Sequence, residues 1–206
     1  MRGDILILFL AITLFASCNR TSFDHEEDLL AHIKNPENGY LQEKKVNGVD
    51  IALMYRPTDL LVNQELNGNH SEQLVDSLRK KYASYLYFNL HLSKNGKELL
   101  SAVPSDRNEF GALVNKLAFG MGESVHLYTN TKDTIAMADY IYPRMYGMSG
   151  STSLLLVYPN NEKAKNADFL NFTIEDIGLA TGEIKFKIYQ ETIANEPQLA
   201  FNPENE

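Results

Sequence analysis

The amino-acid sequence predicts an α+β protein, an antiparallel β-sandwich or curled sheet with two to three helices packed on it. Short segments of alternating apolar and polar residues are joined by turn dipeptides, which is typical of antiparallel hairpins. Helical periodicity is confined to a few separate stretches. Neither a strand–helix–strand alternation nor a repeat of fixed period occurs, so a parallel sheet and a solenoid are both disfavoured.

The first 17 residues have the pattern of a secretory signal peptide. A short start containing Arg2 is followed by the apolar run Ile5–Phe15 and then by two small residues, Ala16 and Ser17. The run is too short for a permanent membrane span, which takes about twenty residues. Asp4 weakens the pattern, because it cancels the charge of Arg2.

The end of this leader, Phe15-Ala16-Ser17-Cys18, resembles the lipobox of bacterial lipoproteins. The resemblance covers 18 residues and departs from the usual motif at Phe15, where the family more often has leucine. It implies cleavage before Cys18 and attachment of a diacylglycerol to its thiol, so that lipid on Cys18 anchors the chain to a membrane. The alternative is an ordinary secreted protein with one cysteine at the cleavage site. Asn19 is not the aspartate associated with retention at the inner membrane, which favours the outer membrane of the cell envelope.

Composition limits the classes of partner and the means of stabilisation. The net charge of −8 offers no basic patch for nucleic acid or for acidic lipids. Cys18 is the only cysteine, so no disulfide can form within the chain. We expect a lipidated tether over 18–23, a single domain over 24–194 and a loose C-terminal tail over 195–206.

In the first half of the chain, local signals mark helices and one clear hairpin. Asp24 is a candidate N-cap for the first helix, and Asn47-Gly48 suits a type I′ turn between two strands. The predicted elements are helices over 25–34, 58–66 and 71–82 and strands over 40–46, 49–55 and 85–92.

The second half has one strong helix and several strands. Asp106 and Glu109 resemble a capping box, followed by apolar residues at helical spacing up to Phe119. The predicted strands cover 124–129, 134–142, 153–158, 169–175 and 183–192, with a turn at Thr181-Gly182. The predicted core includes Leu53, Phe88, Leu90, Leu113, Leu117 and Leu155.

Three patterns that suggest chemistry do not meet its requirements. His25, Asp28 and His32 share one helix face at a spacing that can hold a metal; the alternative is an exposed polar face near the tether. His25-Glu26 also resembles the start of the H-E-x-x-H motif of zinc proteases, but Leu29 stands where the second histidine belongs. The segment 147–151, Gly-Met-Ser-Gly-Ser, lacks the second glycine of a nucleophile elbow. The G-x-G at 120–122 follows a helix instead of opening one. We expect no catalytic residues, no metal and no cofactor.

The segment 140–147 is less ordinary. Tyr140, Tyr142, Arg144 and Tyr146 lie beside a glycine-rich loop, and tyrosine, arginine and methionine are enriched in binding surfaces. The alternative is a strand with one aromatic face that ends at Pro143. The sequence therefore favours a non-enzymatic envelope module that binds a protein or glycan partner or scaffolds an assembly; the alternative is an envelope hydrolase whose site residues are distant in sequence.

Overall fold

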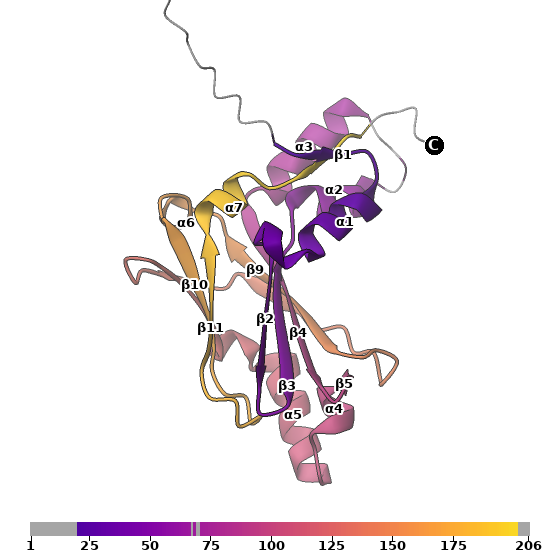
Figure 1. Cartoon of the computed structure of the whole chain (residues 1–206), viewed down its shortest axis with the longest axis vertical. Coiled ribbons are helices and arrows are strands. Elements are labelled where there is room, and N and C mark those ends of the chain that lie inside the picture. The colour runs from indigo at the N-terminus through magenta and orange to yellow at the C-terminus, as the bar shows by residue number, and fades with distance from the viewer. Residues whose placement is uncertain (1–19, 67, 69–70, 202–206) are drawn as a thin grey trace, which may run out of the picture.

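The computed structural model describes residues 20–66, 68 and 71–201 and has the expected α+β class (Figure 1). Two antiparallel sheets pack face to face. The first sheet has the strand order β2-β3-β4-β9-β8, with β5 paired to β4, and the second has the order β11-β10-β6-β7. We call them sheet one and sheet two.

Sheet one is formed by β2 (Leu41–Val46), β3 (Val49–Tyr55), β4 (Tyr85–Lys94), β5 (Lys97–Glu98), β8 (Asp139–Ile141) and β9 (Thr152–Pro159). Sheet two is formed by β6 (Val125–Thr129), β7 (Thr134–Ile135), β10 (Phe169–Ile174) and β11 (Ile184–Tyr189). The turn between β2 and β3 has positive φ at both Asn47 and Gly48, which confirms the predicted hairpin.

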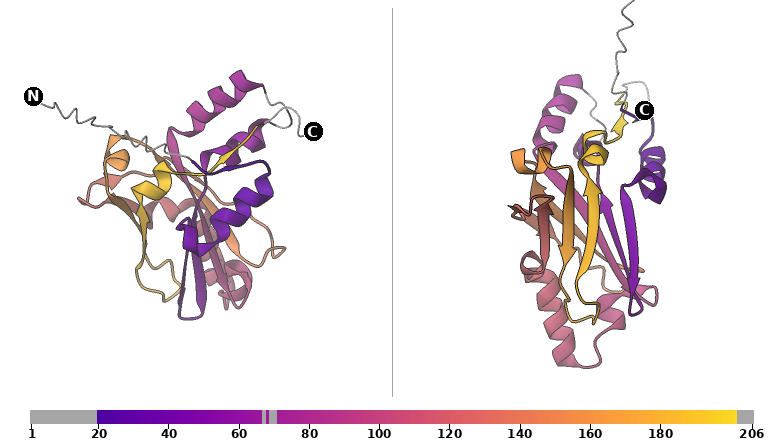
Figure 2. Two further views of the ribbon diagram at one scale, coloured as in Figure 1. Left: turned by 45° about the horizontal axis from the view of Figure 1, so that its top comes forward. Right: turned by 60° about the vertical axis from the view of Figure 1, so that its left-hand side comes forward.

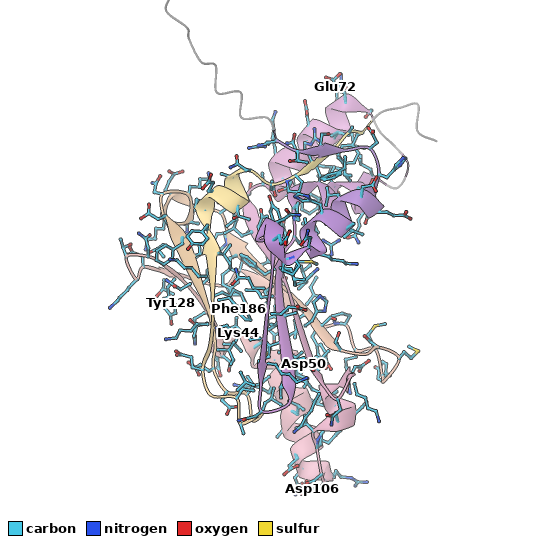
Figure 3. All side chains as sticks on the ribbon, viewed as in Figure 1. Lys44, Asp50, Glu72, Asp106, Tyr128 and Phe186 are labelled. Atoms are coloured by element: carbon cyan, nitrogen blue, oxygen red, sulfur yellow. The ribbon has the colours of Figure 1, made fainter. Side chains whose placement is uncertain are left out.

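Helices close the two ends of the sandwich (Figures 1 and 2). One end carries α1 (Glu26–Lys34), α2 (Thr58–Leu66) and α3 (Glu72–Tyr82), and the other carries α4 (Leu99–Ala102) and α5 (Arg107–Phe119). Glu72 and Asp106, at the starts of α3 and α5, lie at opposite ends of the molecule (Figure 3). The remaining helices are the short segments η1 (Pro36–Asn38), η2 (Met121–Glu123), α6 (Glu162–Lys165) and α7 (Gln190–Ala194).

The core between the sheets centres on three aromatic rings. Phe88 and Tyr158 from sheet one meet Phe172 from sheet two, with ring centroids 5.5–6.1 Å apart. All three side chains are fully buried. Tilted and edge-to-face pairs of this kind add about 0.5–1.5 kcal/mol each beyond their buried area.

The edges of the two sheets are joined differently on the two sides. On one side β2 lies beside β11, where Gln42 donates a hydrogen bond to the backbone oxygen of Lys187 at 2.6 Å. Lys44 reaches over the ring of Phe186 on the same side (Figure 3). On the other side the chain itself crosses between the sheets, because β7 pairs with β6 and β8 pairs with β9. The predicted strand over 134–142 is therefore wrong: it is two short strands in different sheets.

The end of the chain is also more ordered than predicted. Gln198–Leu199 forms β12, which pairs in parallel with β1 (Ser22–Phe23). The prediction of a loose tail from residue 195 is wrong as far as residue 201. The predicted tether over 18–23 ends earlier than expected, because residues 22–23 form β1. The remaining tail, 202–206, lies outside the described residues. Local composition suggested disorder, but side chains distant in the sequence hold this segment in place.

An ion pair between buried Asp59 and partly exposed Arg79 holds β12. The Arg79 guanidinium donates to both carboxylate oxygens of Asp59, at 2.9 and 2.6 Å. Asp59 also accepts the backbone N–H of Leu199 at 2.8 Å, and Arg79 donates to the backbone oxygen of Leu199 at 2.9 Å. The pair thus ties the last strand to α2 and α3.

Three local predictions are corrected by burial and capping. Leu155 is not in the core, because the inner face of β9 carries Leu154 and Leu156; an unbroken apolar run hides which residues point inward. The N-cap of α1 is His25 instead of Asp24. The predicted strand 183–192 stops at Tyr189, where α7 begins.

We expect Leu117→Ala to destabilise the protein by about 2–5 kcal/mol, because Leu117 is fully buried and the change leaves a cavity. Phe119→Ala on the same helix is the matched control, since Phe119 is 82% exposed and should cost less than about 0.5 kcal/mol. Urea unfolding of both variants tests this. Equal losses at the two positions would contradict the orientation of α5.

Glu196 gives a prediction about pH. Burial raises the pKa of its carboxyl, although hydrogen bonds from the Thr58 amide and the Tyr55 hydroxyl, both 2.9 Å, oppose the rise. A raised pKa in the folded state means that stability falls as the pH rises from about 4.3, the ordinary value for glutamate, through the folded-state value. Glu196→Gln replaces the carboxyl with a neutral amide, so its stability does not show this fall with pH.

The free energy of unfolding of Glu196→Gln, taken relative to wild type, should therefore increase between about pH 4 and pH 7. Urea titrations at several pH values measure it. Glu191→Gln, an exposed position on the neighbouring α7, is the control and should show no such trend. A difference that stays constant with pH for Glu196→Gln would refute the argument.

Candidate functional site

The segment between β8 and β9, residues 142–151, forms a loop that projects beside α4 (Figure 1). The strand β8 ends at Ile141, two residues before Pro143, and as expected no strand pairing continues past the proline, since it lacks the backbone donor. We call this segment the 142–151 loop. It lies toward the α4–α5 end of the sandwich, away from β1 (Figure 1).

The loop contains a tight turn with an unusual residue at its tip. The backbone N–H of Met148 donates to the carbonyl of Met145 at 3.0 Å. The two central residues, Tyr146 and Gly147, both have positive φ, 53° and 83°, as in a type I′ turn. Positive φ is uncommon for a bulky residue and is worth attention as a sign of function. The turn displays the Tyr146 side chain, which is 77% exposed.

A buried carboxylate fixes this turn to the body of the protein. Glu98, at the end of β5, is only 4% exposed. Its two oxygens accept the backbone N–H groups of Gly147 at 3.2 Å and Ser149 at 3.0 Å. The loop is thus attached through its backbone, which leaves its side chains free to face outward. The role of Glu98 is not predictable from the sequence, since nothing around a single glutamate after a turn shows that it accepts hydrogen bonds from a distant loop.

A pocket of about 230 Å³ lies between the loop and the helices α4 and α5. Arg144 lies over the Tyr146 ring, with the guanidinium carbon 5.2 Å from the ring centroid. Burial raises the pKa of Tyr142, and the nearby Arg144 charge opposes this shift. The lining consists of Glu98, Leu100, Ser101, Phe110, Tyr142, Arg144, Tyr146 and Gly147.

Exposed apolar side chains gather around the same loop. Met148 is 80% exposed, and Met145 and Ile141 are also exposed. Phe110, from α5, adds a further exposed ring at the pocket. Of the eight large apolar side chains that are exposed in the described part of the chain, five lie here. Such a concentration is typical of an interaction surface, whereas isolated exposed apolar residues are ordinary.

The four tyrosine and arginine residues singled out in the sequence do not form one surface. Arg144 and Tyr146 are exposed as expected. Tyr140 and Tyr142 are partly buried and pack against the core, because Tyr140 lies on the inward side of the short strand β8. Only Tyr142 also reaches the pocket, so Tyr140 is removed from the candidate site.

The other sequence candidates lie elsewhere and do not converge. His32 packs between the rings of Phe23 and Tyr40, and its Nδ1 lies 3.1 Å from the Asn38 amide nitrogen. Within the described ranges, no three His, Cys, Asp or Glu side chains are grouped so that they could hold a metal. Ser149 lies in the 142–151 loop, which leads into a strand and not into the helix of a nucleophile elbow.

Two histidines do have side-chain partners. His91 Nδ1 lies 2.8 Å from the Ser153 hydroxyl across β4 and β9, and burial lowers the pKa of His91. His126 pairs with Glu175 at 2.8 Å. A serine–histidine pair needs a third group to orient the imidazole and donors for an oxyanion. In the described part of the molecule, no acidic side chain bonds to His91.

Comparison with known proteins adds no function. No protein-family model and no curated protein sequence matches the chain. One similar solved structure is a protein of unknown function from Burkholderia pseudomallei K96243, with 12% identity over 82% of this chain and 86% of that one and a TM-score of 0.40. Another is a DUF4426 family protein from Pseudomonas aeruginosa PAO1, with 11% identity over 73% of this chain and 94% of that one and a TM-score of 0.37.

Among the helices within residues 20–66 and 71–201, none is long and apolar enough to cross a membrane. The leader and Cys18 lie outside the described residues.

Proposed function

We propose that the protein is a lipid-anchored, non-enzymatic module of the cell envelope and that it captures a partner protein through the 142–151 loop. The observation that carries the proposal is the group of exposed apolar side chains on a loop whose backbone is fixed by buried Glu98. A rigid loop loses little conformational entropy when it binds, so its contacts are available for affinity.

The position of the loop suits an anchored protein. With lipid on Cys18, only the residues before Ser22 would separate the membrane from β1, a reach of about 14 Å for four extended residues. The end carrying β1, α1 and α3 would then face the membrane. The 142–151 loop lies toward the opposite end, where a partner could reach it (Figure 1).

The alternative is an envelope hydrolase that uses the His91–Ser153 pair. His91 lines an open pocket of about 480 Å³ together with Glu43, Asp50 and Ser93, and the Ser153 hydroxyl lies 2.8 Å from His91 Nδ1. We favour binding, because catalysis by such a pair needs an orienting acid and an oxyanion site, and the geometry around His91 supplies neither among the described residues.

Cys18→Ala should abolish both lipid attachment and membrane anchoring, since Cys18 is the only thiol in the chain. Mass spectrometry of the mature protein and membrane fractionation measure the two effects. A wild-type protein whose N-terminus is an unmodified Cys18, or which begins elsewhere, would contradict the lipid anchor.

Arg144→Ala/Tyr146→Ala should reduce partner recovery from native envelopes by at least about tenfold, because truncating such residues at an interface can cost over 2 kcal/mol. The measurement is quantitative mass spectrometry of proteins co-purified in mild detergent. Lys187→Ala/Tyr189→Ala is the matched control: it removes a comparable contact between a cation and a tyrosine ring on sheet two, where Lys187 Nζ lies 4.9 Å from the Tyr189 ring centroid. Equal recovery by both double variants would show that the loop is not the binding surface.

A further inference from the structure

We propose that the pocket beside the 142–151 loop receives one large apolar side chain from a partner protein, and that Arg144 binds an acidic side chain next to it in the partner's sequence. The proposal rests on the proposed function and specifies the chemistry of the partner.

The size of the pocket fits a side chain better than a free small molecule. Its volume of about 230 Å³ lies below the range of about 300–1,000 Å³ that is usual for small-molecule sites. Leu100 and Phe110 supply apolar surface from the helices, and Tyr142 and Tyr146 supply it from the loop. An aromatic or branched aliphatic anchor would find contacts on several sides, as hot-spot residues at protein interfaces do.

Arg144 provides the charged contact of the proposed binding site. Its guanidinium has no ion pair with any described carboxylate, and its packing on Tyr146 restricts its orientation. Planar guanidinium groups form two parallel hydrogen bonds with a carboxylate, which gives both strength and direction.

The other charged group at the pocket does not compete for Arg144. Glu98 is the only carboxylate among the lining residues, and its oxygens already accept the Gly147 and Ser149 amides. Glu98 lowers the net positive potential near Arg144, so a bare anion is a weaker match than an anion beside an apolar anchor. The net charge of −8 has the same effect at long range, since it repels acidic partners. Recognition must therefore come from short-range contacts.

The turn geometry makes the pocket wall rigid. Gly147 lies beside α4, where a Cβ placed on it would make an ordinary van der Waals contact with the Ser101 hydroxyl at 3.6 Å. Its φ of 83°, and not a lack of space, disfavours other residues. The wall that carries Arg144 and Tyr146 is held by the two hydrogen bonds from Gly147 and Ser149 to Glu98. Such preorganisation lowers the entropic cost of binding even a short peptide segment.

The test uses blocked tetrapeptides and the mature protein in mild detergent, with saturation-transfer NMR to detect weak binding. We expect acetyl-Gly-Phe-Glu-Gly-amide to bind about fivefold more tightly than its Gln counterpart, in keeping with a charge-assisted hydrogen bond at a partly desolvated site. The Ala-Glu counterpart should show no measurable binding. Arg144→Gln should abolish the difference between Glu and Gln, whereas Lys187→Gln should preserve it.

The outcomes separate this inference from the proposed function. Equal binding of the Glu and Gln peptides would overturn the role of Arg144, and tighter binding of a peptide with its acid only at a free C-terminus would overturn the choice of a side chain. If no peptide binds while Arg144→Ala/Tyr146→Ala still loses its partners, the inference is wrong and the proposed function stands. If no peptide binds and the partners are retained, both are wrong.

Discussion

The structure depends on apolar contact between two sheets that no covalent cross-link holds together. Cys18 is the only cysteine, so the free energy that joins sheet one to sheet two must come from packing. Phe88, Tyr158 and Phe172 supply the centre of that contact. The side-chain contacts between β2 and β11 and the crossing of the chain from β7 to β8 then follow at the two flanks, where the sheets come close enough for edges to meet.

At the end of the molecule that carries α1, α2 and α3, a buried carboxylate is paired with the polar groups around it. Asp59 is buried, and an unpaired charge there would cost several kcal/mol, so Arg79 and the amide of Leu199 satisfy it. The ion pair therefore helps to hold both ends of the described chain, because β12 pairs with β1. The proposed lipid anchor on Cys18 would therefore pull on a strand whose partner, β12, is held by the Arg79–Asp59 ion pair.

The sequence was sufficient wherever the signal was local. Asn47-Gly48 specified its hairpin turn, and Asp106 caps α5 by accepting two backbone amides. It was insufficient wherever the outcome depended on distant partners. The run 134–142 looks like one strand, but its two halves pair with β6 and β9, and no local feature reveals that division. The polar composition of the tail predicts a loose segment, but hydrogen bonds of the Leu199 backbone with Asp59 and Arg79, far away in the chain, keep it ordered.

The candidate site shows the same limit at a finer scale. Composition drew attention to Arg144 and Tyr146, because both types are common at interfaces, and both side chains are exposed. It could not separate them from Tyr140, whose side chain the strand directs toward the core. The residue that holds the loop in place is Glu98, which is almost fully buried and accepts hydrogen bonds from two backbone N–H groups of the loop. Burying a carboxylate costs free energy, and a simple turn does not need a buried carboxylate to hold it. The proposed binding surface would account for this cost, because its exposed side chains would need a fixed arrangement that a solvated loop does not need.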